Sequence, residues 1–209
     1  IRKLVEVGYD EGDITIFDNF SWGKPEYIPS RVTTLKGDIT NYEEVLSALK
    51  NVEAVYHFAA IKEVPYSIKY PMETNKVNVE GTLNVLEGAR KEGCEKVIYA
   101  SAASVYGAPR YLPIDEEHPT NPESPYGASK LAGENYCNCY YYTYGLNTVC
   151  LRYTNVYGPM MTSKNVIDIF VENALSGKPL ILEAEGKQRK QFTSIHDVAH
   201  INVQVLKKK

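Results

Sequence analysis

The sequence predicts an α/β protein built on a parallel sheet. Short apolar runs rich in β-branched residues alternate with longer helical stretches, which is the pattern of successive βαβ units. The run Ala54 to Ala60 is almost continuously apolar. The composition, 44% hydrophobic and 23% charged over 209 residues, is that of an ordinary soluble globular protein.

The expected elements follow in order along the chain. Strands are predicted over 13–18, 32–36, 54–60, 96–101 and 147–153, and helices over 41–50, 72–90 and 126–144. Asn41 is a suitable N-cap for the first helix, while Gly93 and Gly145 are suitable C-terminal stops for the other two. After Gly158 the pattern loosens, and we expect a helix over 166–175, a strand over 180–183 and a helix over 196–206.

Charge and composition exclude several classes of function. A net charge of -3 predicts no nucleic-acid surface and no membrane surface, and no apolar run has the length of a membrane span. The four cysteines form no CxxC pair, which favours free thiols and a cytoplasmic location. His196 and His200 are one helical turn apart without an evident third ligand, so we predict no metal site.

The first strand and a Gly-rich loop of a dinucleotide fold are expected to be absent from this sequence. Such folds carry the Gly-rich turn after their first strand and an acidic residue about 20 positions later. Asp18 ends a predicted strand as that acid does, whereas no Gly-rich turn precedes it. The chain is therefore expected to begin inside the first helix, and it also stops on a helix.

Tyr126 and Lys130 are the central catalytic candidates. A YxxxK spacing at the start of a helix puts both side chains on one face, one turn apart. A tyrosine hydroxyl titrates near pH 10, and a neighbouring ammonium together with a cationic nicotinamide would favour the phenolate. Such a group can take a proton from an alcohol while hydride leaves its carbon. YxxxK alone is weak, and the preceding run Ser101 to Gly107 supplies the context.

A set of motifs surrounds this pair and carries a family resemblance. They are Asp18-Asn19-Phe20, Gly37-Asp38-Ile39, His57-Phe58-Ala59-Ala60-Ile61-Lys62, Asn78-x-x-Gly81-Thr82, Ser104-Val105-Tyr106-Gly107, Pro125-Tyr126-Gly127-Ala128-Ser129-Lys130 and Arg152-Tyr153-Thr154-Asn155-Val156-Tyr157-Gly158-Pro159. Over essentially its whole length the chain resembles an extended short-chain dehydrogenase/reductase of the NAD-dependent epimerase/dehydratase family. The resemblance implies a Rossmann-type doubly wound parallel sheet in residues 1–155 and a smaller substrate-binding part in 156–209.

The resemblance also implies an NAD site. Its residues would be Asp18, Asn19, Asp38, Ile39, Phe58, Ala59, Ala60, Lys62, Tyr126, Lys130 and Tyr153. The first two would hold the adenosine ribose, the next two would lie at the adenine, and Tyr153 would border the nicotinamide. Asn78 would be a structural helix residue near the site. An acid at Asp18 repels a ribose phosphate, which favours NAD over NADP. Taken singly, Asp18 also fits a surface turn, Asp38 a helix cap and Lys62 a solvated lysine.

Two departures from the family pattern affect the chemistry. The family has Ser or Thr where this chain has Ala102, so a bridging hydroxyl is missing. If the segment is extended, Ser104 points to the same side and is a candidate catalytic replacement. The family's 4,6-dehydratases carry an acid just after that Ser or Thr, and Ala103 disfavours dehydration.

The second departure lies in the expected substrate-binding part. Relatives have Arg-Asp-Phe where this chain reads Lys190-Gln191-Phe192, and Arg189 is adjacent. Lysine keeps the charge but loses the two-pronged geometry of arginine. By resemblance Asn155 touches the substrate diphosphate, and Arg189 and Lys190 are candidates for the same contact. Both are alternatively surface cations.

The leading hypothesis is NAD-dependent epimerisation at C4 of a nucleotide sugar, most simply a UDP-sugar, through a transient 4-keto intermediate. Alternatives are another NAD-dependent oxidoreductase of nucleotide sugars, such as a decarboxylase or reductase, and a catalytically weak NAD-binding sensor or scaffold. The chain contains 17 tyrosines, and five of them lie between Tyr136 and Tyr144. Aromatic enrichment suits subunit contacts, so a homodimer through this helix is expected.

Overall fold

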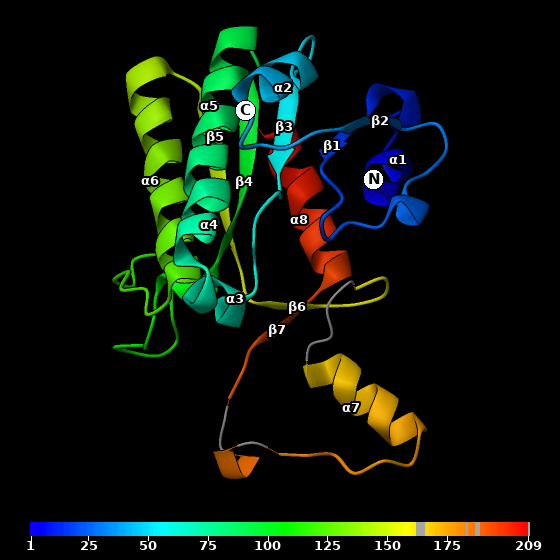
Figure 1. Cartoon of the computed structure of the whole chain (residues 1–209), viewed down its shortest axis with the longest axis vertical. Coiled ribbons are helices and arrows are strands. Elements are labelled where there is room, and N and C mark those ends of the chain that lie inside the picture. Colours follow the sequence, from blue (N-terminus) through cyan, green and yellow to red (C-terminus); the bar gives the residue numbers. More distant parts are fainter. Residues whose placement is uncertain (162–165, 183, 187–188, 209) are drawn as a thin grey trace.

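Every strand pair in the structure is parallel (Figure 1). The computed structural model describes residues 1–161, 166–182, 184–186 and 189–208. Its strands are β1 (Thr15–Asp18), β2 (Thr33–Lys36), β3 (Ala54–His57), β4 (Lys96–Ala102), β5 (Asn147–Tyr153), β6 (Asn155–Tyr157) and β7 (Phe192–Ser194). Its α-helices are α1 (Arg2–Glu6), α2 (Tyr42–Ala48), α3 (Val64–Lys69), α4 (Pro71–Asn75), α5 (Gly81–Glu92), α6 (Pro125–Tyr144), α7 (Val166–Leu175) and α8 (Ile195–Lys207).

The strands are hydrogen-bonded in three groups rather than in one continuous sheet. β1 pairs with β2, β3 and β5 flank β4, and β6 pairs with β7. In the described part of the chain no strand is hydrogen-bonded to both β1 and β3, so the first two groups stay separate. The parallel pairing predicted from the βαβ alternation is therefore confirmed, while its continuity across all strands is not observed.

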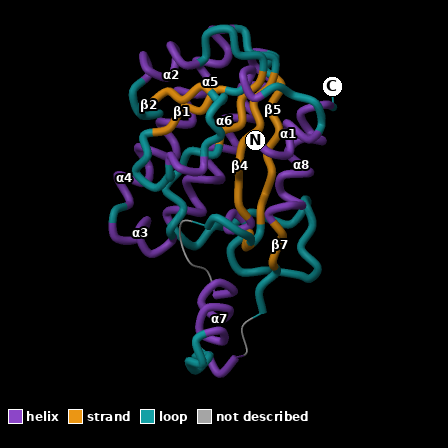
Figure 2. Tube along the Cα trace, turned by 90° about the vertical axis from the view of Figure 1, so that its right-hand side faces the viewer, coloured by secondary structure: helices purple, strands orange, loops and turns teal. Residues whose placement is uncertain are grey.

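Helices cover both faces of the β3–β4–β5 group. Tyr99 and Ser101 on β4 hydrogen-bond to α6, and Arg152 on β5 does the same, so these alternate positions face α6. Lys96 points the other way and donates to the last carbonyl groups of α8. Figure 2 shows the strands between these helices, with α7 lying away from the sheets.

The core lies between β4, α5 and α6. Val97, Tyr99, Leu86 and Cys137 are fully buried there. Gly133 on α6 allows this close packing, because a Cβ at that position would lie 2.2 Å from the Tyr99 hydroxyl oxygen. The aromatic ring of Tyr99 therefore fixes the distance between β4 and α6.

Several expected elements are confirmed with small shifts, and two expectations are wrong. The first is β3, which ends at His57 rather than at Ala60, because the following turn is held by side-chain hydrogen bonds from Asn78. The helix expected over 72–90 is confirmed as a continuous helical stretch formed by α4, a π-helical segment, η3 (Lys76–Glu80), and α5, with Gly93 as its C-terminal stop. The short helix α3 precedes it, and α3 and α4 each have proline in their first turn.

The second wrong expectation is the strand over 180–183. Residues 180–182 are not in a strand, and residue 183 lies outside the described residues. Strands β6 and β7 were not expected, because three-residue strands carry too little periodicity to be recognised. The boundary near residue 155 stays a prediction, but α8 returns from the C-terminal part to pack on β4.

Candidate functional site

The predicted site residues follow the carboxyl ends of the parallel strands. Asp18 ends β1, Asp38 follows β2, Phe58 follows β3 and Tyr153 ends β5. In open α/β sheets, ligands bind at this edge. The fold therefore places these predicted residues at the carboxyl ends of the strands, although their assigned roles remain predictions.

Tyr126 lies at the first turn of α6. Ser124 caps this helix by accepting a hydrogen bond from the backbone of Gly127, and Pro125 occupies the first helical position. A Cβ at Gly127 would lie 2.7 Å from the carbonyl oxygen of Ser104, so the turn after β4 packs directly on α6. The backbone N–H of Tyr126 also donates to Ser67 Oγ on α3 at 3.1 Å. Tyr126 is thus held between the segments that follow β3 and β4.

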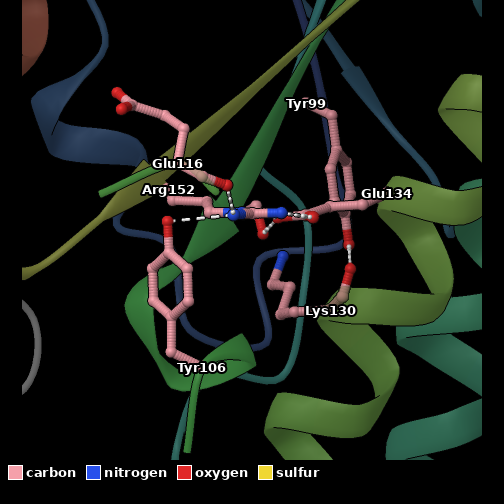
Figure 3. Close-up of polar contacts among 7 residues, drawn as sticks. Tyr99, Tyr106, Glu116, Lys130, Glu134 and Arg152 are labelled. Carbon is pink, nitrogen blue, oxygen red and sulfur yellow. Dashed lines mark hydrogen bonds and ion pairs between the residues drawn. The ribbon is translucent and has the colours of Figure 1, made fainter. Parts of the chain in front are cut away.

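Lys130 lies one turn further along α6 and is directed at β4 (Figure 3). Its side chain donates from Nζ to the carbonyl oxygen of Ala100 at 2.8 Å and lies 4.9 Å from the ring centroid of Tyr99. The residue is only 3% exposed. Burial lowers the pKa of Lys130 to about 8, so its cation is held in an unfavourable environment.

The pKa of Tyr126 is raised to about 12, which is opposite to the direction expected from the sequence. Burial is the larger cause, and the negative charge of Glu63 at the start of α3 adds to it. Lys130 does not offset these effects, because its ammonium group is directed at Ala100. Glu63 was not among the sequence candidates. The only indication in the sequence is its position next to the His57 to Lys62 motif.

Ser104 is not placed as the extended-segment argument assumed. β4 ends at Ala102, and the next three residues form a 3-10 turn, η4 (Ala103–Val105), so strand alternation does not extend to Ser104. Its hydroxyl oxygen is buried and has no hydrogen-bond partner within the described residues. A buried hydroxyl of this kind is available to a bound group or a water molecule. The catalytic role of Ser104 stays a prediction.

The ends of β1 and β2 are joined by acidic and amide groups. Asn19 donates from Nδ2 to Asp38 Oδ2 at 3.0 Å, and Asp18 accepts from the backbone of Phe20 at 2.7 Å. Burial alone would raise the pKa of Asp38, but hydrogen bonds from Thr40 and Asn19 outweigh it and lower the pKa. An anionic pair at this edge suits the ribose hydroxyls of NAD and disfavours a ribose phosphate.

Ile39 belongs to the core rather than to an exposed surface. Its side chain is 7% exposed and packs against Gly81 on α5, while its carbonyl oxygen accepts from Asn84 Nδ2 at 2.9 Å. α5 therefore anchors the chain just after β2, and the adenine contact of Ile39 stays a prediction.

The turn after β3 is held by Asn78 from the π-helical segment. Asn78 Oδ1 accepts from the backbone of Ile61 at 2.7 Å, and its Nδ2 donates to the Ile61 carbonyl oxygen and to Ser129 Oγ, both at 2.9 Å. Of the residues expected to line the cofactor, Phe58 and Lys62 are exposed, whereas Ala59 and Ala60 are half-buried. Asn78 therefore ties this turn to α6, one helical turn from Tyr126.

The expected substrate-binding residues are brought together by β6 and β7. Both the backbone N–H and the Nδ2 of Asn155 donate to the carbonyl oxygen of Gln191, next to the exposed Arg189 and Lys190. Tyr153, in contrast, accepts a 2.6 Å hydrogen bond from Asn202 of α8. The side chain of Tyr153 thus lies on the face of the sheet that α8 covers, whereas Tyr126 belongs to α6 on the other face.

A model of the NAD dependent epimerase/dehydratase family matches residues 2–209. The chain belongs to this family. Its relatives include a putative UDP-glucose 4-epimerase of Methanocaldococcus jannaschii, 39% identical over 99% of this chain and 68% of that protein. The UDP-glucose 4-epimerase of Corynebacterium glutamicum is 33% identical over 95% of this chain. The chain spans 62% of the length of that second relative.

Solved structures of family members share the fold. The NAD complex of UDP-glucose 4-epimerase from Thermus thermophilus superposes with a TM-score of 0.91 at 34% identity, covering 100% of this chain and 70% of its own. A dTDP-glucose 4,6-dehydratase from Streptomyces venezuelae with NAD bound is also similar, with a TM-score of 0.88 at 29% identity, covering 98% and 66%. Both epimerases and dehydratases therefore lie close to this chain.

The family assignment identifies NAD as the cofactor, and the chemistry at the ends of β1 and β2 fits it. Within the described ranges no cluster of three or more His, Cys, Asp or Glu residues is arranged to hold a metal ion. None of the helices there has the length and apolar character needed to span a bilayer.

Proposed function

We propose that the protein catalyses NAD-dependent epimerisation at C4 of a nucleotide sugar through a 4-keto intermediate. The observation that carries the proposal is the position of Tyr126 and Lys130, on one face of α6 beside the carboxyl end of β4. That strand end carries Ala102 and Ala103 and no carboxyl group. The proposal concerns the whole enzyme, because the relatives are longer than this chain.

Each residue has a defined task in this proposal. The Tyr126 hydroxyl takes the proton of the sugar C4 hydroxyl, and Lys130 stabilises the resulting phenolate by its charge. Lys130 would have to turn from Ala100 toward the active-site edge to do so, and its exclusion from water strengthens the interaction. When bound, NAD accepts hydride from C4 and returns it. Asp18, Asn19 and Asp38 hold the adenosine end of NAD.

Nucleotide recognition is assigned to the β6–β7 pair. Asn155, Arg189 and Lys190 lie together on an exposed surface, and two cations beside an amide suit a diphosphate. The relatives named as UDP-glucose 4-epimerases make a UDP-sugar the first substrate to test.

Epimerisation is favoured over dehydration by the residues at the end of β4. Loss of water from C6 needs an acid to protonate the departing hydroxyl. Ala103 and Ser104 provide no carboxyl group there. Glu63 raises the pKa of Tyr126 by its charge and is a carboxylate near the site that would allow the second candidate, a 4,6-dehydration. Another oxidoreductase of nucleotide sugars would differ from an epimerase by releasing NADH. An NAD-binding sensor would differ by showing no turnover.

A homodimer through α6 is part of the proposal. Tyr141, Tyr142 and Tyr144 expose 50%, 78% and 53% of their surface at the C-terminal end of α6. Exposed tyrosines of this kind are enriched at subunit contacts. A cytoplasmic location is proposed from the four free cysteines. Analytical ultracentrifugation of the wild type beside Tyr142→Glu tests the dimer, and a wild-type monomer would reject it.

The experiment is an assay of NAD-loaded enzyme with UDP-galactose and UDP-glucose. Interconversion of the two, with no net NADH, supports the proposal. Tyr126→Phe is expected to lower turnover by about 10²–10⁴-fold, because it removes the hydroxyl that takes the proton. No turnover of either sugar by enzyme that retains NAD would reject epimerisation and favour the sensor.

A further inference from the structure

A single guanidinium group joins four segments beside the proposed site (Figure 3). Arg152 on β5 donates from Nε and Nη2 to the two carboxylate oxygens of Glu134 on α6, at 2.9 and 2.7 Å. Its Nη1 donates to the hydroxyl of Tyr106 at 2.9 Å and to the carbonyl oxygen of Glu116 at 3.4 Å. Glu134 also accepts from Ser101 Oγ at the end of β4, at 2.5 Å.

The contacts are partly buried and geometrically specific. Glu134 is 8% exposed and Tyr106 is 7% exposed, while the side chain of Arg152 is 25% exposed. The guanidinium carbon lies 4.8 Å from the Tyr106 ring centroid, and that ring forms a T-shaped pair with His118 at 5.5 Å between centroids. A bidentate pair in such surroundings resists displacement more than an exposed pair does.

Glu134 is aligned with the proposed catalytic residues. Tyr126, Lys130 and Glu134 occur at intervals of four on α6 and therefore lie along one face of the helix. Tyr106 immediately follows the η4 turn, which packs on the first turn of α6 at Gly127. The network around Arg152 thus links the η4 turn to the helix face that carries Tyr126.

We propose that Arg152 is a positioning residue, which holds the η4 turn at the distance from Tyr126 that proton transfer requires. This inference rests on the proposed function and adds that the sugar C4 hydroxyl binds between that turn and Tyr126. Lysine at position 152 would keep the charge, but it cannot bind both oxygens of Glu134 and reach Tyr106 at once. A misplacement of about 1 Å at a reacting group costs about 10²-fold in rate.

The test compares Arg152→Lys with Arg31→Lys in the NAD-loaded enzyme. Arg31 pairs with Asp10 at 2.7 Å on the surface and serves as the matched control. The rate at which a nucleotide sugar reduces bound NAD in a single turnover is expected to fall about 10–10²-fold in Arg152→Lys, with bound NAD and KM within about twofold of wild type. The control is expected to match wild type.

Hydrogen exchange supplies a readout that does not depend on turnover. The amides of Tyr106 and Asn121, which bond to Ala103 and Val105, are expected to exchange faster in Arg152→Lys, while those of central β4 are unchanged. Faster exchange with an unchanged rate of NAD reduction would show that the network is merely structural, and would overturn the inference. Unchanged exchange in Arg152→Lys would also overturn it.

Two further outcomes keep the inference separate from the proposed function. If the wild type binds NAD but no nucleotide sugar reduces it, the proposed function is rejected. The positioning role of Arg152 is then rejected as well, whatever the exchange experiment shows. If Arg152→Lys does not fold, Tyr106→Phe removes one contact of the network, and a reduction rate equal to wild type would overturn the inference.

Discussion

Replacing Lys130 with methionine is expected to stabilise the protein at pH 7 while removing its proposed activity. The pKa of Lys130 falls from 10.5 to about 8 on burial. Because a tenfold change in an equilibrium corresponds to about 1.4 kcal/mol, the buried cation costs about 3 kcal/mol at neutral pH. Methionine also loses the hydrogen bond to Ala100, worth about 1 kcal/mol, so the expected net gain is about 2 kcal/mol.

The pH dependence gives this prediction a definite sign. The pKa of Lys130 in the folded state lies below its unfolded value, so the unfolded chain binds the additional proton between about pH 8 and 10.5. Wild-type stability therefore rises with pH through that window relative to Lys130→Met. The advantage of the variant should be largest below pH 8 and should shrink as the pH rises through the window, and above pH 10.5 the variant should be less stable by about 1 kcal/mol, because only the lost hydrogen bond remains.

Urea unfolding of the NAD-free protein at several pH values measures this difference, and Lys96→Met is the contrasting control. Lys96 is also buried, but its Nζ donates to the carbonyl oxygens of Val205, Leu206 and Lys208 at the end of α8. Its replacement leaves those groups without a donor and should cost about 1–3 kcal/mol. A Lys130→Met variant that is less stable than wild type at pH 7, or whose gain does not change with pH, would refute the reasoning.

Three further outcomes are expected. Gly133→Ala should lower the free energy of unfolding by about 1–3 kcal/mol, because its Cβ would lie 2.2 Å from the Tyr99 hydroxyl oxygen; urea midpoints equal to wild type would contradict the close contact. Ser104→Ala should lower turnover of the NAD-loaded enzyme about tenfold if its buried hydroxyl serves proton transfer, and unchanged turnover would dispose of that role. Asp18→Asn should raise the affinity for NADP relative to NAD in equilibrium titrations, whereas a constant ratio would argue against a ribose contact.

Helix boundaries set by local chemistry were predictable from the sequence. Asn41 caps α2, and Gly145 ends α6 in the left-handed conformation that favours glycine. β4 and β5 were expected over nearly their observed lengths, since short runs rich in β-branched and aromatic residues between helices leave few alternatives.

Features that depend on long-range side-chain contacts were not predictable. The turn that follows the early end of β3 is held by Asn78 in the π-helical segment, which bonds to Ile61 and Ser129 far from it in sequence. The link between Arg152 and Glu134 joins residues 18 positions apart on different elements, so no local periodicity indicates it. Motif spacing did bring Tyr126 and Lys130 onto one helix face, but the direction of the Tyr126 pKa depended on burial that only the fold reveals.

The most direct test of C4 epimerisation is to follow a deuterium label placed at C4 of UDP-glucose. If the hydride removed from C4 returns to the same carbon, NMR will find the label at C4 of UDP-galactose, with NAD regenerated and no NADH released. Deuterium at C6 of a 4-keto product would instead mean that water had been eliminated before the hydride returned. That result, or stoichiometric release of labelled NADH, would contradict the proposed function.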